Sequence, residues 1–109
     1  MLRNCLIILL TMVTVQSAQA QRCVASIYWE GSRTANGERF HPDGLTAASK
    51  TLPFNSKVRV SYGGKSVVVR INDRGPFVRG RCLDLARGAA RKLGILEAGV
   101  VTVHYEVIG

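Results

Sequence analysis

Polar and apolar side chains alternate with a period of two in the second half of the chain, which is the pattern of half-buried β-strands. Residues 57–62 alternate in this way, and Gly63 and Gly64 then offer the positive φ of a two-residue hairpin turn into the β-rich run 66–71. Residues 101–107 alternate as well, with three valines and a tyrosine on one face. The sequence therefore predicts one β-hairpin and a half-buried strand near the C-terminus.

One segment has a helical period instead. Leu85, Ala89 and Leu93 fall at i, i+4 and i+8, Asp84 is a suitable N-cap before them, and Gly94 is placed to end the helix. The other apolar stretches are short and carry β-forming residues. We therefore expect a mostly β domain with one short helix, and we find no internal repeat or interdomain linker.

The first 20 residues differ in composition from the rest. A single positive charge, an apolar run over 6–15 and small residues before Gln21 are typical of a cleaved secretory signal peptide. The apolar run is too short to span a bilayer as a helix, which needs about 20 residues, so an uncleaved anchor is the weaker alternative. We predict a signal peptide at 1–20, one domain at 21–109 and no stable membrane anchor.

The 109-residue chain is strongly basic, with 15 lysines and arginines against 7 acidic residues. An excess of cations on an exported domain predicts an anionic polymer as partner. Nucleic acid is excluded as that polymer, because export is expected and the sequence carries no recognised nucleic-acid motif. We expect neither a metal nor a cofactor, and we expect the domain to be a monomer.

Cysteine usage agrees with export. Cys5 lies in the predicted signal peptide, so Cys23 and Cys82 remain as a pair in an oxidising compartment and predict a disulfide. Closing a loop of roughly 60 residues would stabilise a small domain by about 4 kcal/mol in the chain-entropy model. The alternatives are two free buried thiols or one lipidated cysteine. Lipidation is disfavoured because Arg22 precedes Cys23 and no small-residue lipobox is present.

Two polar segments carry the candidate chemistry. The segment 71–85 combines two carboxylates and three arginines around a Gly-Pro turn, and 34–40 supplies Glu38 beside a glycine. Asp73 follows a β-rich run, so we expect its carboxylate where a strand opens into a turn; an Asx turn is the alternative. For Glu38 the alternative is a solvated loop charge. Two loops with one acid each suggest a cleft that holds a glycosidic bond between them.

Five stretches resemble one known family closely, and together they cover nearly the whole chain after the first two dozen residues. The family is rare lipoprotein A (RlpA), and the stretches are ASIY at 25–28, TANGERF at 34–40, LTAASKTLPF at 45–54, VVVRINDRGPFVRGR at 67–81 and LDLARGAARKLG at 83–94. The resemblance implies a six-stranded double-psi β-barrel. It also implies an endolytic lytic transglycosylase that cleaves peptidoglycan between N-acetylmuramic acid and N-acetylglucosamine in the periplasm or outside the cell, leaving 1,6-anhydro ends.

The resemblance also implies a role for each motif residue. Asp73 is the catalytic acid, which protonates the bridging oxygen and then takes the C6 proton as the anhydro ring closes. Glu38 positions the sugar or stabilises positive charge at the anomeric carbon. The acid must be protonated near neutral pH, so we expect burial to raise its pKa. The residues expected to bind substrate are Asn72, Arg74, Ser49 and Arg79.

Ser49 departs from the family pattern. The family commonly has a histidine at this position that is implicated in activity, and a serine hydroxyl cannot shuttle protons near pH 7. His41 lies close in sequence and is the candidate to compensate, although a surface histidine is the simpler interpretation. The rival to an enzyme is therefore a non-catalytic, expansin-like wall-binding module, and a structural partner of the envelope machinery is a third class.

Overall fold

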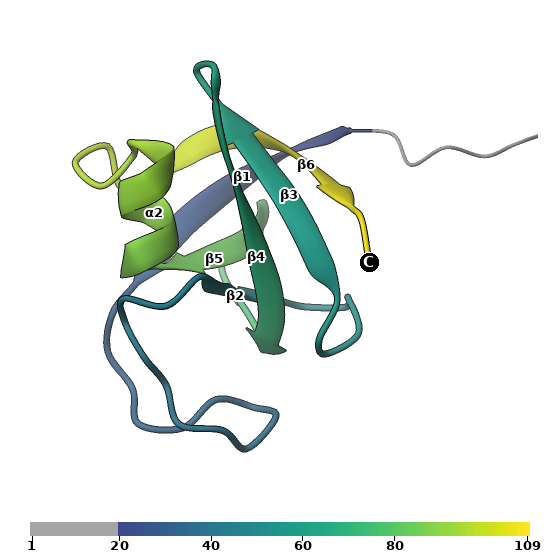
Figure 1. Cartoon of the computed structure of the whole chain (residues 1–109), viewed down its shortest axis with the longest axis vertical. Coiled ribbons are helices and arrows are strands. Elements are labelled where there is room, and N and C mark those ends of the chain that lie inside the picture. The colour runs from purple at the N-terminus through teal and green to yellow at the C-terminus, as the bar shows by residue number, and fades with distance from the viewer. Residues whose placement is uncertain (1–19) are drawn as a thin grey trace, which may run out of the picture.

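The computed structural model describes residues 20–109, so the predicted signal peptide lies outside the described residues except for Ala20. Within this range the chain forms six strands and one helix (Figure 1). No helix of residues 20–109 is long and apolar enough to cross a membrane. In chain order the elements are β1 (Gln21–Tyr28), β2 (Thr46–Ser49), β3 (Lys57–Tyr62), β4 (Lys65–Asp73), β5 (Arg81–Ala86), α2 (Arg87–Leu93) and β6 (Val101–Val107).

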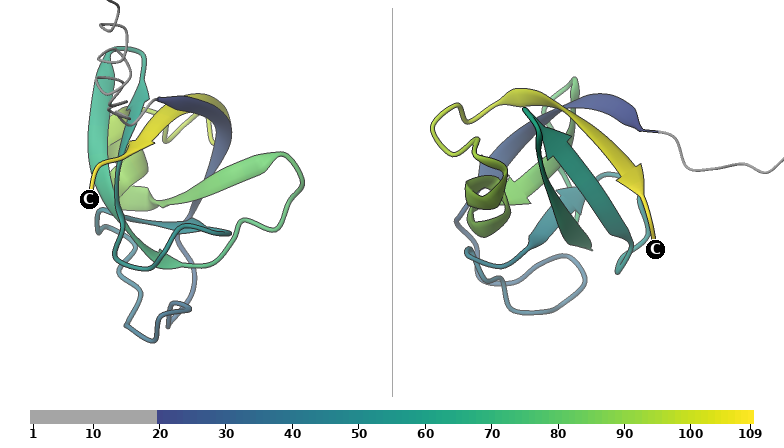
Figure 2. Two further views of the ribbon diagram at one scale, coloured as in Figure 1. Left: turned by 90° about the vertical axis from the view of Figure 1, so that its right-hand side faces the viewer. Right: turned by 45° about the horizontal axis from the view of Figure 1, so that its top comes forward.

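The strands close into one barrel in the order β1, β5, β2, β4, β3, β6 (Figure 2). Two neighbouring pairs are parallel, β1 with β5 and β2 with β4, and each of these pairs contains a register shift. The other four pairs are antiparallel. This architecture confirms the predicted six-stranded β-barrel with one short helix.

The predicted hairpin and the predicted C-terminal strand are both present. β3 and β4 pair from Lys57 with Arg70 to Tyr62 with Lys65, and Gly63 and Gly64 form the turn with φ of 56° and 83°. The alternating apolar residues of both strands point into the barrel, where they meet those of β5, β6 and α2. The largest of these fully buried side chains are Val58, Val60, Val69, Ile71, Leu83, Leu85, Leu93 and Val103. Because each contributes about 1.5–3 kcal/mol on burial, their alternation fixes which face of each strand is internal.

The predicted start of the helix is wrong. α2 begins at Arg87, and its N-cap is Ala86, which makes no side-chain capping bond. Asp84 and Leu85 belong instead to β5, where hydrogen bonding to β1 on one side and β2 on the other prevails over the helical period. The end of the helix is as predicted, with Gly94 in the left-handed conformation at φ 78°.

The predicted disulfide is confirmed. Cys23 in β1 and Cys82 in β5 are bonded, with their Cα atoms 5.8 Å apart. The bond lies across the parallel pair of these two strands, so it joins the N-terminal strand covalently to the strand that carries Asp84. Neither free thiols nor lipidation of Cys23 agrees with this geometry.

The long connection between β1 and β2 projects from one end of the barrel and is attached to α2 (Figure 1). The backbone N–H of Gly88 donates to the carbonyl of Pro42 at 2.9 Å. The carboxylate of Asp43 forms ion pairs with Arg87 at 3.0 Å and Arg91 at 3.3 Å. A Cβ atom at Gly88 would overlap the backbone carbonyl of Asp43. Glycine is therefore required here by the close approach of the connection to the helix.

We predict that Gly88→Ala destabilises the protein although alanine is the better helix former. The added methyl group must displace backbone at Asp43, and overpacking of this kind costs about 1–3 kcal/mol of unfolding free energy. Denaturant titration measures the change. Lys92→Ala, on the exposed side of the same helix, is the control and should shift the free energy by less than about 0.5 kcal/mol. An unchanged unfolding free energy in Gly88→Ala would show that the connection moves away without cost.

Candidate active site

Asp73 is the last residue of β4, as expected, and its carboxyl group joins three segments of the chain. Its Oδ1 accepts hydrogen bonds from the backbone N–H of Ala35 at 2.8 Å and of Arg74 at 2.9 Å. Its Oδ2 accepts one from the Tyr28 hydroxyl at 3.2 Å. Only the bond to Arg74 is local, so the carboxyl group does more than cap its own turn. It holds the 34–40 loop and the end of β1 against the end of β4.

A second carboxyl group shares a pocket with Asp73. This pocket has a volume of about 330 Å³, and its walls include Ser26, Tyr28, Asp73 and Asp84. Asp84 lies in β5 directly opposite Ser26 in β1, and the Ser26 hydroxyl donates to Asp84 Oδ1 at 2.9 Å. The parallel pairing of β1 and β5 therefore delivers an acid and its hydrogen-bond donor to the pocket from residues 58 positions apart.

Burial gives the groups of this pocket unusual proton affinities. Desolvation raises the pKa of Asp84 and outweighs the opposing hydrogen bond from Ser26 and the positive charge of Arg81. The negative charge of Asp73 raises the pKa of Asp84 further. Burial and the neighbouring Asp73 also raise the pKa of the Tyr28 hydroxyl above its usual value, so this hydroxyl stays protonated as a donor. The pocket thus combines a carboxyl group whose pKa is raised with one that accepts three hydrogen bonds.

Sequence reasoning missed Asp84, Ser26 and Tyr28 as site residues. A signal for Asp84 was present, since Leu83, Asp84 and Leu85 alternate with the period of a strand and the acid is the polar member. The helical spacing of Leu85, Ala89 and Leu93 led instead to the prediction that Asp84 is a helix N-cap. Ser26 and Tyr28 carry no local signal, because their role depends on the pairing of β1 with β5.

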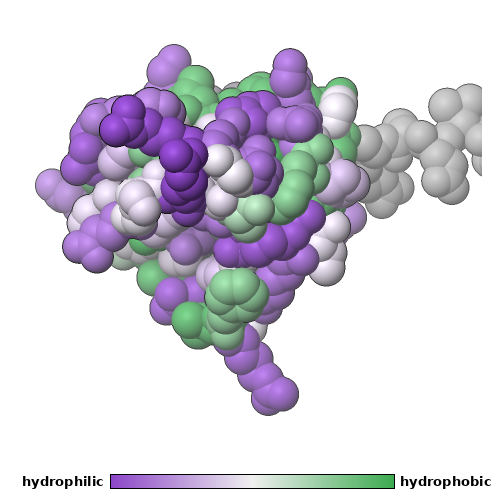
Figure 3. Space-filling model, turned by 90° about the horizontal axis from the view of Figure 1, so that it is seen from below, coloured by the Kyte–Doolittle hydropathy of each residue, from purple (hydrophilic) through white to green (hydrophobic). Residues whose placement is uncertain are grey.

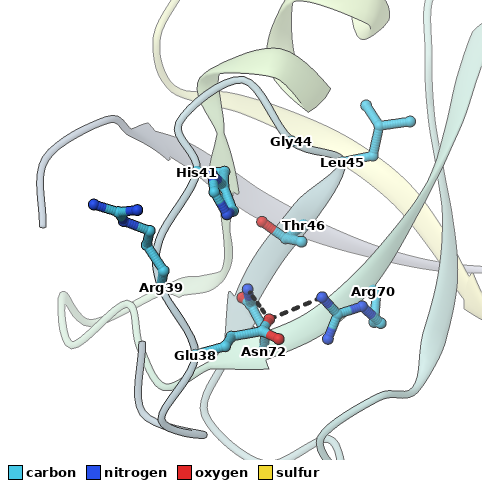
Figure 4. Close-up of a pocket in the computed structure, with 8 residues that line it drawn as sticks. All are labelled: Glu38, Arg39, His41, Gly44, Leu45, Thr46, Arg70 and Asn72. Atoms are coloured by element: carbon cyan, nitrogen blue, oxygen red, sulfur yellow. Dashed lines mark hydrogen bonds and ion pairs between the residues drawn. The ribbon is translucent and has the colours of Figure 1, made fainter. Parts of the chain in front are cut away.

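Glu38 lines a different pocket from Asp73. That pocket has a volume of about 550 Å³ and is shown in Figure 4. Glu38 Oε1 accepts hydrogen bonds from Arg70 Nη2 at 2.8 Å and Asn72 Nδ2 at 2.7 Å. The bond from Arg70, followed by that from Asn72, holds the pKa of Glu38 below its usual range. The two carboxylates that the sequence suggested on either side of one cleft are therefore not brought to one pocket, and Asp84 is the carboxyl group that shares a pocket with Asp73.

The 34–40 loop lines the larger pocket with Glu38 and Arg39 and also binds Asp73 of the smaller one. Thr34 and Glu38 close a tight turn, with the N–H of Thr34 donating to the carbonyl of Glu38 at 2.9 Å. The N–H of Asn36 donates to the carbonyl of Asn72 at 3.3 Å, and that of Ala35 binds Asp73. The backbone N–H groups of Ala35 and Asn36 thus bind the last two residues of β4, which fixes the loop against the end of that strand.

The remaining predicted binding residues have internal partners or lie on the surface. Arg74 donates to the carbonyl oxygens of Ser49 at 3.1 Å and Leu52 at 2.8 Å, and its guanidinium lies 3.9 Å from the centre of the Phe54 ring. Arg74 therefore fixes the turn after β2. Arg79 is exposed on the loop between β4 and β5.

Ser49 is buried at the end of β2, and its hydroxyl oxygen accepts the N–H groups of Thr51 and Leu52 at 3.3 and 3.1 Å. It lines neither the pocket of Asp73 nor that of Glu38. His41 is exposed and lies at the rim of the Glu38 pocket (Figure 4). The structure therefore does not place His41 where it could replace a histidine at position 49.

The end of the barrel that carries these pockets is mostly hydrophilic, with small separate hydrophobic areas (Figure 3). Among residues 20–109 no three side chains of histidine, cysteine, aspartate or glutamate gather as metal ligands. A polar surface with two pockets and partly buried carboxyl groups suits a hydrophilic ligand such as a saccharide.

Comparison with known proteins decides the family. Residues 20–105 match the family described as lytic transglycolase. The chain belongs to this family. A probable endolytic peptidoglycan transglycosylase RlpA from a Nostoc species is 54% identical over 93 residues, covering 79% of this chain and 25% of the relative. The endolytic peptidoglycan transglycosylase RlpA of Pseudomonas aeruginosa is 47% identical over 105 residues, covering 90% and 31%. The predicted resemblance is confirmed, and this lytic transglycolase chain spans about a quarter to a third of these relatives.

Two solved structures share the fold. A Streptomyces papain inhibitor superposes with a TM-score of 0.72 at 23% identity, over 84% of this chain and 96% of the inhibitor. A Clavibacter michiganensis expansin in complex with cellohexaose superposes with a TM-score of 0.69 at 17% identity, over 84% of this chain and 51% of the expansin. At these identities the likeness confirms the barrel fold of this family member and nothing further.

We predict that Ser49→Ala lowers the unfolding free energy of this lytic transglycolase domain by about 1 kcal/mol, because the N–H groups of Thr51 and Leu52 lose their acceptor. Its effect on any activity should be small, since the hydroxyl faces its own turn. Ser66→Ala, at an exposed position of β4, is the matched control and should leave stability unchanged. A large loss of activity with unchanged stability would instead place the Ser49 hydroxyl in the reaction.

Proposed function

We propose that this domain is the catalytic part of an endolytic peptidoglycan lytic transglycosylase that works outside the cytoplasm. The substrate is a glycan strand, cleaved between N-acetylmuramic acid and N-acetylglucosamine with formation of a 1,6-anhydro end. The observation that carries the proposal is the shared pocket of Asp73 and Asp84, in which one carboxyl group has a raised pKa. Membership of the family and the names of its peptidoglycan-cleaving relatives support it.

The chemistry assigns different roles to the two carboxyl groups. Asp84, whose pKa is raised by burial, gives its proton to the bridging oxygen as the bond from that oxygen to the anomeric carbon breaks. The C6 hydroxyl oxygen of the muramic acid then bonds to the anomeric carbon, and its proton returns to Asp84. Asp73 carries the negative charge that stabilises the positive anomeric carbon between these steps. The proton-donor role expected for Asp73 thus passes to Asp84, and the charge-stabilising role expected for Glu38 passes to Asp73.

Replacing Asp84 by asparagine should abolish cleavage without loss of fold. Asparagine keeps the shape but has no proton to transfer, so we predict at least about a hundredfold lower rate of cleavage of purified cell wall. Mass spectrometry of the glycans released by the unmodified protein should find ends that are one water molecule lighter than hydrolytic ends. Asp73→Asn should also slow the reaction, and Glu97→Gln at an exposed position is the control. Reducing ends in place of anhydro ends would show a hydrolase.

The alternative is a non-catalytic wall-binding module, and the specific observation in its favour is Ser49, which stands where the family commonly has histidine. This alternative predicts no new glycan ends with the unmodified protein, together with equal sedimentation with cell wall for the unmodified protein and for Asp84→Asn. That pair of results would overturn the proposal that the domain is an enzyme.

Asp84→Asn should also make the protein more stable near neutral pH. The folded-state pKa of Asp84 lies above its unfolded value, so its contribution to stability is fully present below the unfolded pKa of about 4 and is lost as the pH rises through the folded pKa. Asparagine carries no such charge. Denaturation at pH 4 and pH 7 should therefore show similar stability for both proteins at the lower pH and a gain for the variant at the higher pH. A variant less stable at pH 7 would contradict the burial of this acid.

A further inference from the structure

Tyr28, the last residue of β1, is held at both its ring and its hydroxyl group. Its hydroxyl donates to Asp73 Oδ2 at 3.2 Å, and its ring stacks on Phe40 with ring centres 4.7 Å apart and planes 13° from parallel. Phe40 is buried in the connection between β1 and β2, which Asp43 fastens to α2 by ion pairs. The phenol hydroxyl therefore reaches Asp73 from a ring that packing keeps in one orientation.

The two oxygens of the Asp73 carboxyl group have different donors. Both hydrogen bonds to Oδ1 come from backbone N–H groups, those of Ala35 and Arg74. Oδ2 accepts its hydrogen bond from a side chain, that of Tyr28. A carboxylate has about four acceptor positions, so with three bonds formed it can still face one developing positive charge. Tyr28 is thus the side chain that sets the orientation of Oδ2.

Hydrogen bonds are also what stabilises the charge on Asp73. Within residues 20–109 no cationic side chain forms an ion pair with Asp73. The guanidinium of Arg74 lines the same pocket but donates to backbone carbonyl oxygens. The other charged groups of the pocket, Arg81 and Asp84, come from β5. The charged groups that flank Tyr28 and the 34–40 loop line other pockets or bind other partners, and they are Glu30, Arg33, Glu38 and Arg39.

Two carboxyl groups in one pocket compete for a proton, and the competition is decided by what donates to each. Ser26 gives Asp84 one hydrogen bond, whereas Asp73 accepts three. A donor to a carboxylate favours its charged form. Burial, followed by the neighbouring charge of Asp73, raises the pKa of Tyr28 above its usual value, so the phenol remains a donor and does not itself lose a proton.

We propose that Tyr28 is a positioning residue, whose hydroxyl orients Asp73 Oδ2 and keeps the negative charge on Asp73 while Asp84 holds the proton. The stack on Phe40 fixes the hydroxyl in place. The proposal rests on the proposed function for the reaction that the two acids carry out. Tyr28 acts through Asp73 and transfers no proton to the glycan.

Tyr28→Phe tests the hydroxyl alone, because phenylalanine keeps the ring that stacks on Phe40. With cell-wall glycan as substrate, kcat should fall about tenfold and KM should stay unchanged, since one hydrogen bond to a charged group is lost and none to substrate. The acidic limb of the pH–rate profile should move up by about one pH unit, because Asp73 is protonated more readily without this donor. Tyr105→Phe is the matched control. It loses a hydroxyl bound to Gln21 at 2.8 Å, outside the Asp73 pocket, and should leave kcat and the limb unchanged.

Phe40→Leu tests the stack, because it leaves the Tyr28 hydroxyl present but removes the ring that holds it. The acidic limb should move in the same direction as in Tyr28→Phe and by less. Combining both substitutions should move the limb no further than Tyr28→Phe does, because the two residues act through one hydrogen bond. A limb that stays in place in Tyr28→Phe while stability falls would reduce Tyr28 to a structural role and overturn the proposal.

A measurement without cleavage separates this proposal from the enzyme. The side-chain carboxyl carbon resonance of Asp73, followed by NMR as the pH is lowered, should report protonation at a pH about one unit higher in Tyr28→Phe than in the unmodified protein or in Tyr105→Phe. That shift in a protein that releases no anhydro ends would support the pairing of Tyr28 with Asp73 and remove the transglycosylase. Anhydro ends together with an unshifted Asp73 resonance in Tyr28→Phe would overturn the role of Tyr28 and leave the enzyme standing.

Discussion

The position of β5 between β1 and β2 is the constraint on which the site depends. Both neighbours come from the first half of the chain, and their hydrogen bonds to β5 close the barrel. The same pairing places Asp84 opposite Ser26 and brings Cys82 to Cys23. The long-range pairing of β1 with β5 therefore creates the environment of Asp84, and the Cys23–Cys82 disulfide reinforces that pairing. If this pairing were lost, the pocket would disappear even though every residue that lines it was unchanged.

The carboxyl groups at this end of the barrel show how the local environment shifts the pKa of the same chemical group in opposite directions. Glu38 is held ionised by a guanidinium and an amide, whereas Asp84 is pushed towards its neutral form by burial. Neither state follows from the residue type, because both acids have similar pKa values in water. The same residue chemistry therefore yields a carboxyl group with a lowered pKa in one pocket and one with a raised pKa in the other.

The sequence was sufficient where structure is local or where only one pairing was available, and insufficient elsewhere. The hairpin of β3 and β4 follows from alternation and two glycines. The disulfide joins residues 59 positions apart, but the predicted signal peptide left only two cysteines to pair. The closed barrel came from resemblance to a family, since its parallel pairings leave no periodic trace. Asp84 was assigned to a helix cap because a strand and a helix both fit its neighbours, and only pairing with two other strands decides between them. Which acid shares a pocket with Asp73 depends on that decision.

The contact of Gly88 with the connection between β1 and β2 has a consequence for recognition. This connection carries Glu38, and it is fastened at Asp43 by ion pairs and at Phe40 by stacking on Tyr28 with ring centres 4.7 Å apart. A loop ordered in this way loses its conformational freedom when the chain folds and does not lose it again when a ligand binds. The close approach that Gly88 permits thus keeps the pocket beside Glu38 preorganised, so that binding there carries no cost of loop ordering.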